Sequence, residues 1–75
     1  MQLVPLDFLA TGESAVVRDV QGPADQVMRL AEMGLAAGVK VQMLVPGRPA
    51  LVLVGTHRLS LRLDDEIEVL VEPAP

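Results

Sequence analysis

A chain of 75 residues without a cysteine excludes a disulfide-stabilised fold and any metal site built on thiolate ligands. Six basic and ten acidic residues give a formal charge of −4, and Phe8 is the only aromatic residue. Nucleic-acid binding relies on a basic surface and stacking aromatic rings, so no nucleic-acid partner is expected. At this length we expect one domain, residues 1–75, with a thin core.

The N-terminal segment, residues 1–11, resembles neither a secretory leader nor a membrane span. Pro5 and Asp7 interrupt its apolar residues, and no basic start precedes them. The longest apolar runs of the chain are about five residues, whereas about 20 are needed to cross a bilayer. We therefore expect no membrane insertion and a reducing compartment such as the cytoplasm. The apolar residues of this segment are expected to cover one end of the core: Leu3, Leu6, Phe8 and Leu9.

A valine-rich strand is predicted next, over about residues 14–20. Its apolar residues do not alternate cleanly, since Ala15 and Val17 share one face while Val16 and Val20 share the other. A β-bulge, or a strand buried on both faces, would explain this pattern.

A short amphipathic helix is predicted between Pro23 and Gly34. Its buried face consists of residues three and four positions apart: Val27, Leu30 and Ala31. Gly34 stands where a left-handed C-cap belongs, because glycine takes a positive φ without a Cβ clash. Leu35 would then fold back onto Leu30, as in a Schellman ending.

After Gly38 the hydrophobic period changes to two, which predicts strands over about residues 39–45, 50–54, 58–63 and 67–72. Three of them have a clear inward face: Val39, Val41, Met43 and Val45; Leu59, Leu61 and Leu63; Ile67, Val69 and Val71. Five short strands and one helix predict a mainly β fold, a small five-stranded barrel, because closure removes exposed strand edges.

Metal ligands are sparse in this sequence. His57 is the only histidine and falls in a predicted turn, and the run Asp64-Asp65-Glu66 lacks the spaced ligands of a calcium loop. A metal site needs three or four ligands at matched spacing. We therefore expect no resident cofactor, and these four residues are only weak candidates for a divalent transition metal such as ferrous iron.

Catalysis and thioether ligation are not indicated either. Ser14 and Ser60 have no positioned base, and the chain has no glycine-rich phosphate loop. Met43 is expected in the core, and Met28 and Met33 are expected to fill gaps beside the helix face. We do not expect an enzyme.

The segment 50–54 is apolar on both faces, although a small barrel buries only one. If Ala50, Val52 and Val54 point inward, Leu51 and Leu53 point outward. The same argument turns two further leucines outward, Leu44 and Leu70. We expect these four leucines to form a contact surface for a partner or for a second copy of the chain. In the alternative, the N-terminal segment folds over them.

Several of these features recur together in one known family. They are Gly12 with Ala15, the run Arg29-Leu30-x-Glu32-Met33-Gly34-Leu35-x-x-Gly38, and then Pro49, Gly55, Leu59-Ser60-Leu61-Arg62 and Ile67-Glu68-Val69. With this pattern, which covers residues 3–72, the chain resembles the ferrous iron transport protein A (FeoA) family. It departs mildly, with Ala37 where a proline often precedes the glycine, and with Leu51 and Leu53 on a strand face that is commonly more polar.

The resemblance implies an SH3-like barrel that acts in the cytoplasm as an accessory of the bacterial ferrous-iron permease, a FeoB-like membrane GTPase. The implied partner is the cytoplasmic part of that permease, and the barrel itself would not transport iron. The C-terminal domain of iron-dependent repressors shares this fold, but here no DNA-binding helices precede it. Three functions remain open: an accessory of the permease, a module responsive to iron or another transition metal, and a self-associating module such as a homodimer.

Overall fold

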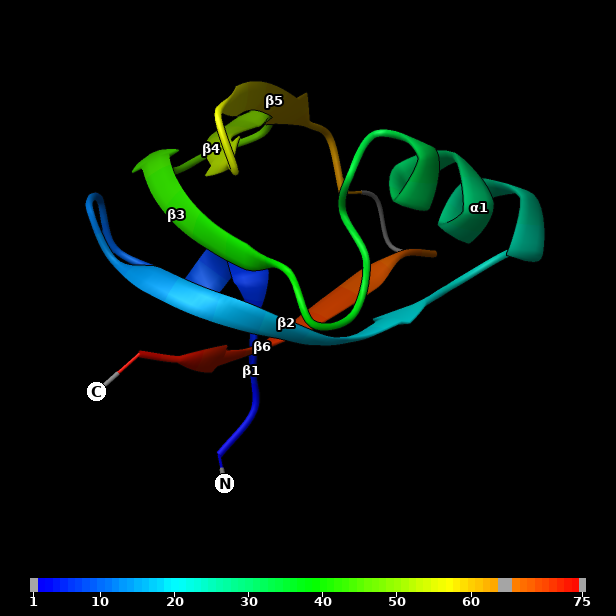
Figure 1. Ribbon diagram of the computed structural model, residues 1–75, viewed down its shortest axis with the longest axis horizontal. Coiled ribbons are helices and arrows are strands. Elements are labelled where there is room, and N and C mark those ends of the chain that lie inside the picture. The colour runs from blue at the N-terminus through cyan, green and yellow to red at the C-terminus, as the bar shows by residue number, and fades with distance from the viewer. Residues whose placement is uncertain (1, 64–65, 75) are drawn as a thin grey trace.

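The chain folds into one antiparallel sheet with a single α-helix, as a computed structural model shows for residues 2–63 and 66–74 (Figure 1). The elements are β1 (Val4–Pro5), the 3₁₀ helix η1 (Leu6–Phe8), β2 (Ser14–Gln21), α1 (Ala24–Glu32), β3 (Lys40–Val45), β4 (Ala50–Val54), β5 (His57–Leu61) and β6 (Glu68–Pro73). The strand order in the sheet is β1-β6-β2-β3-β4-β5. The prediction of a mainly β fold with one short helix is confirmed.

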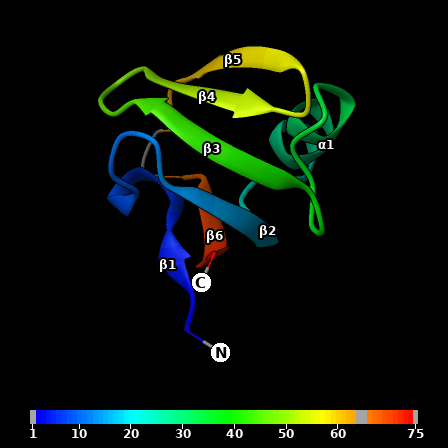
Figure 2. The same cartoon turned by 60° about the vertical axis from the view of Figure 1, so that its left-hand side comes forward.

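The sheet curls so that β4 and β5 face β2 and β6 across the core, and α1 lies at one end of this arrangement (Figures 1 and 2). The core is entirely apolar among the described residues, which include no buried polar or charged side chain. Its largest fully buried members are Leu6, Leu35, Met43, Val17, Val41, Val52, Val69 and Val71. Met43 is therefore a core residue, as predicted.

The structure has one strand more than predicted. β1 comprises only two residues, whose Cα partners on β6 are Val71 for Val4 and Leu70 for Pro5. A two-residue strand that includes a proline leaves no periodicity in the sequence, so the segment was predicted only to cover the core. Leu6 and Leu9 are buried and do cover the core, whereas Leu3 and Phe8 are exposed, so the prediction is wrong for these two residues.

Two β-bulges set which residues face the core. The first lies between Val17 and Asp19, where β2 pairs with β6, and it accounts for the imperfect alternation of that strand. The second lies between Met43 and Val45, where β3 pairs with β4. The extra residue changes the face of the sheet on which the following side chain lies, and Val45 is 54% exposed. The prediction that Val45 faces inward is therefore wrong.

The end of α1 is a Schellman motif, as predicted. The amide of Leu35 donates to the carbonyl of Leu30 at 2.9 Å, and the amide of Gly34 donates to the carbonyl of Ala31 at 3.0 Å. Gly34 has φ +96°, in the left-handed region. Leu30 and Leu35 are both buried in the core, so the motif attaches the helix to the sheet.

The buried face of α1 is narrower than predicted. Only Leu30 is buried, whereas Val27 is half-buried and Ala31 is exposed. Val27 and Ala31 line an open groove of about 190 Å³ beside β2, because the helix packs on the end of the sheet rather than across its face. For the same reason Met28 and Met33 do not fill gaps beside that face; they are 62% and 42% exposed.

We predict that Gly34→Val lowers the free energy of unfolding by more than about 1 kcal/mol, because a β-branched residue resists positive φ. A Cβ at Gly34 would lie 3.7 Å from Val54 Cγ1, an ordinary contact, so the cost is one of backbone conformation. Urea denaturation measures it. Gly34→Asn should lose less, because asparagine tolerates this region. Ala37→Val is the matched control at an exposed position without positive φ. An unchanged midpoint for Gly34→Val would contradict the assignment.

Candidate functional site

The outer face of β3 and β4 carries three of the four leucines that were predicted to point away from the core. On β4, Ala50, Val52 and Val54 are buried, while Leu51 and Leu53 are half-buried, so the predicted phase of this strand is confirmed. Leu44, at the bulge of β3, is also half-buried. We name Leu44, Leu51 and Leu53 the outer leucine patch.

The neighbours of the outer leucine patch are partly apolar and partly polar. Leu51 is paired with Val45 on β3 and with Ser60 on β5. Leu53 is paired with Gln42 and with Arg58 on the same two strands. Val45 extends the apolar surface, and sequence reasoning missed it because the bulge that turns it outward has no signature in the alternating pattern.

Leu70 lies elsewhere in the sheet. It is half-buried on β6, between Pro5 of β1 and Asp19 of β2. Because β2 separates β6 from β3, Leu70 lies two strands away from the strand that carries Leu44. The N-terminal segment pairs beside Leu70 but pairs with neither β3 nor β4. Strand pairing therefore supports the alternative, that this segment covers the leucines, only beside Leu70.

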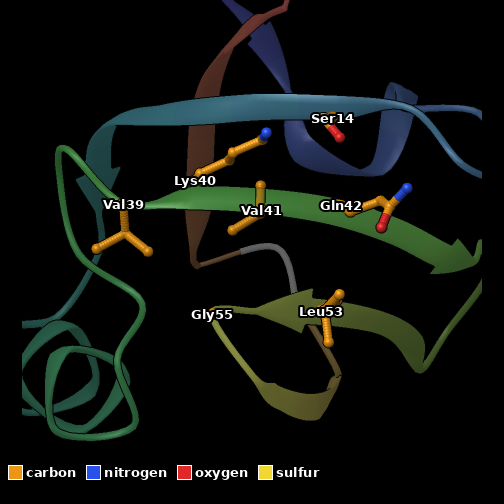
Figure 3. Close-up of a pocket in the computed structure, with 7 residues that line it drawn as sticks. All are labelled: Ser14, Val39, Lys40, Val41, Gln42, Leu53 and Gly55. Carbon is orange, nitrogen blue, oxygen red and sulfur yellow. The ribbon is translucent and has the colours of Figure 1, made fainter.

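An open hollow of about 420 Å³ adjoins the outer leucine patch and shares Leu53 with it (Figure 3). Ser14 of β2, Lys40 and Gln42 of β3 and Leu53 of β4 lie around it, and the remaining lining residues are Val39, Val41 and Gly55. The side chain of Gln42 is held in place because its Nε2 donates to the carbonyl oxygen of Gly12 at 3.1 Å.

The chemistry available in this hollow is that of binding. Its lining offers one hydroxyl, one amide and one ammonium group, and it includes neither a carboxylate nor an imidazole. Ser14 therefore has no base beside it in the hollow, and a serine nucleophile requires one. Together, the hollow and the outer leucine patch form a surface with an apolar centre and polar groups at its margin, as protein interfaces have.

The weak metal candidates are not brought together where the structure describes them. His57 is the first residue of β5 and is exposed, and Glu66 is exposed in the turn before β6. Asp64 and Asp65 lie outside the described residues. Within residues 2–63 and 66–74, no group of three or more histidine, aspartate or glutamate side chains could hold a metal ion.

No helix among the described residues is long and apolar enough to cross a membrane. The most exposed large apolar residue is Phe8 of η1, at 74%. The sequence predicted that Phe8 covers the core, which is wrong. Its apolar character did not reveal on which side of the 3₁₀ helix it lies.

Comparison with known proteins identifies the family of this chain. A family model described as the FeoA domain matches residues 4–73. The chain belongs to the FeoA family. No protein of curated function is a significant match.

Three solved FeoA structures illustrate the likeness. The crystal structure of an iron uptake regulatory protein (FeoA) has a TM-score of 0.87 and 25% identity, over 97% of this chain and 100% of that one. The solution structure of FeoA from Chlorobium tepidum has a TM-score of 0.85 and 25% identity, over 96% and 71%. The zinc complex of FeoA from Stenotrophomonas maltophilia has a TM-score of 0.75 and 38% identity, over 92% and 89%. That protein is described as a prokaryotic SH3 domain protein, which confirms the predicted SH3-like fold.

We predict that Leu51→Lys and Leu53→Lys together leave the chain folded. Substitutions on a surface cost about half a kcal/mol each, so the pair should cost about 1 kcal/mol. Val52→Lys is the matched control on the same strand, because Val52 is fully buried and a charge there costs several kcal/mol. Thermal melting followed by circular dichroism compares the two variants. Loss of the fold in the double variant would place the leucines in the core.

Proposed function

We propose that this protein is an accessory of a bacterial ferrous-iron transport system that binds the cytoplasmic part of the ferrous-iron permease, a FeoB-like membrane GTPase, and modulates it. Membership of the FeoA family supports the transport system. The observation that carries the binding role is the outer leucine patch, whose three leucines on β3 and β4 are partly exposed beside the exposed Val45. The FeoA of Stenotrophomonas maltophilia has itself been proposed as a ferrous iron transport activating factor.

The outer leucine patch contributes part of the free energy that a contact of this kind needs. Complete burial of a leucine side chain stabilises by about 2 kcal/mol, and most of the surface of these three leucines is already covered within the chain. The three leucines and Val45, which is 54% exposed, would therefore contribute at most about 3 kcal/mol in all, before the cost of association. That amount suits a reversible regulatory contact better than a permanent complex.

The proposal describes a binding protein that acts in the cytoplasm, and not an enzyme. It is supported by the family and by the hollow beside the patch, whose lining lacks any carboxylate or imidazole to serve as a base. Ferrous iron is the cargo of the transport system in this proposal, not a resident cofactor of the chain.

Two other functions compete with this proposal. The first is a self-associating module, because a second copy could cover the outer leucine patch. The second is a metal-responsive module, which is favoured by the zinc complex of the Stenotrophomonas protein. Each of the two tests below separates one of these functions from the accessory role.

We predict that the Leu51→Lys, Leu53→Lys variant loses at least tenfold in affinity for the soluble GTPase region of the permease, because interface energy concentrates in a few apolar anchors. Biolayer interferometry measures the affinity. Leu70→Lys is the matched control, a half-buried leucine two strands away from β3. Equal affinity of the double variant and the unchanged chain would exclude the patch as the binding site. Concentration-dependent dimerisation that the double variant abolishes, without permease binding, would support the self-associating module instead.

We predict that His57→Ala leaves iron uptake unchanged in cells at normal protein abundance, because a lone histidine supplies one ligand and a metal site needs three or four. Anaerobic titration of the purified chain with ferrous iron, and separately with zinc, is the direct check. Micromolar affinity that disappears in the His57→Ala variant would revive the metal-responsive module.

A further inference from the structure

The positive charge of this acidic protein is concentrated on one hairpin. Residues 48–63 contain three of the six basic residues, the only histidine and none of the ten acidic residues. All four of these side chains are exposed: Arg48 in the loop before β4, His57 and Arg58 at the start of β5, and Arg62 just after its end. The β4–β5 hairpin is therefore cationic within a chain of formal charge −4.

β5 is also the last strand of the sheet, and Figure 2 shows it outermost beside β4. Apart from the ladder with β4, no backbone hydrogen bond among the described residues involves residues 57–61. In an antiparallel pair, alternate residues turn their N–H and C=O groups away from the partner strand. One edge of β5 therefore has no backbone partner among the described residues.

The turn of the hairpin identifies the residues that face this open edge. Gly55 and Thr56 form a two-residue loop between the paired residues Val54 and His57. Gly55 has φ +61°, whereas Thr56, like every described residue other than glycine, has no positive φ, which is the pattern of a type II′ turn. In such a hairpin the pair that flanks the loop is hydrogen-bonded, and the next pair is not. Arg58 and Ser60 therefore present their backbone groups outward.

We propose that the open edge of β5 accepts an extended, acidic segment of a partner protein, which adds to the sheet as a further strand. This inference goes beyond the proposed function, because it rests on the chain alone and requires no permease.

The charge of the edge selects the occupant. A second copy of the chain would place two cationic hairpins side by side, and like charges directly opposite each other are destabilising. An acidic strand would be attracted instead. Arg58 and Arg62 form no ion pair with any described residue, since the one ion pair among the described residues joins Arg18 to Glu72 at 2.8 Å. The edge charges thus discourage self-pairing and favour an acidic strand.

The faces of β5 define the side chains of that strand. Arg58 and Ser60 lie on the outer face, opposite Leu53 and Leu51, whereas Leu59 lies on the inner face opposite Val52 and is only half-buried. Successive side chains of a strand alternate between faces. An added strand with acidic residues outward, beside Arg58, and apolar residues inward, beside Leu59, would match both faces. The favoured segment is therefore one in which acidic and apolar residues alternate.

The probe for this proposal is the peptide acetyl-Glu-Val-Glu-Val-Glu-Val-amide, added to the full ¹⁵N-labelled chain. The expected result is that the amides of Arg58 and Ser60 exchange with solvent at least tenfold more slowly at saturation, while α1 is unaffected. The same peptide with every backbone nitrogen methylated retains its charge but donates no hydrogen bond, and it should not bind. A Lys-Val repeat of equal length should not bind either.

Two variants test the two parts of the interaction. Arg58→Glu with Arg62→Glu should weaken peptide binding at least tenfold, and Arg29→Glu on α1 is the charge-matched control that should not. Ser60→Pro removes an edge-facing N–H, a substitution that edge strands tolerate, and should abolish the protection. If Ser60→Pro does not fold, the methylated peptide carries the same test.

Several outcomes would overturn the proposal. Equal binding of the methylated peptide would show a charge contact without strand addition. Binding to vesicles of phosphatidylglycerol and phosphatidylcholine, or to single-stranded DNA, that depends on Arg58 without peptide binding would identify a membrane or a nucleic acid as the occupant. Pairing of β5 between two copies in solution would equally exclude it. Failure of the permease to bind would leave the peptide result untouched, so the two proposals fail separately.

Discussion

The sheet of this protein can bury one face, because residues 2–63 and 66–74 supply one short α-helix and no second layer to cover the other face. The inward face forms a wholly apolar core among the described residues, and the Schellman motif at Gly34 attaches α1 to its end through Leu30 and Leu35. Since β4 is apolar on both faces, satisfying the core necessarily leaves Leu51 and Leu53 outside. The surface on which we base the function is thus a direct consequence of how the core is filled.

Two surfaces that we propose for binding lie on neighbouring strands of the sheet. The outer face of β3 and β4 carries the outer leucine patch, and the cationic edge of β5 has no backbone partner among the described residues. Both proposals concern contact with other proteins. The remainder of the chain carries all ten acidic residues, so the orientation of an approaching acidic partner is biased toward the hairpin.

Local patterns in the sequence predicted much of this structure. The period-two strands, the irregularity of β2 and the stop at Gly34 depend on neighbours in the chain, and they were predicted correctly. Features that depend on the order of the strands in the sheet were not predicted correctly. Leu70 is separated from the other leucines because β6 pairs with β2 and β1, and β1 is too short to leave a pattern. The bulge that exposes Val45 and the position of α1 that exposes Ala31 and the two methionines likewise follow from packing between distant segments.

The central claim is that the outer face of β3 and β4 is the contact surface for the permease. Titration of the ¹⁵N-labelled chain with the soluble GTPase region of the permease, followed by two-dimensional NMR, tests it residue by residue. We predict that the amide shifts that change cluster on β3 and β4, at Leu44, Val45, Leu51 and Leu53, and that the amide shifts of α1 stay in place. Changes confined to α1, or to β6 around Leu70, would contradict it.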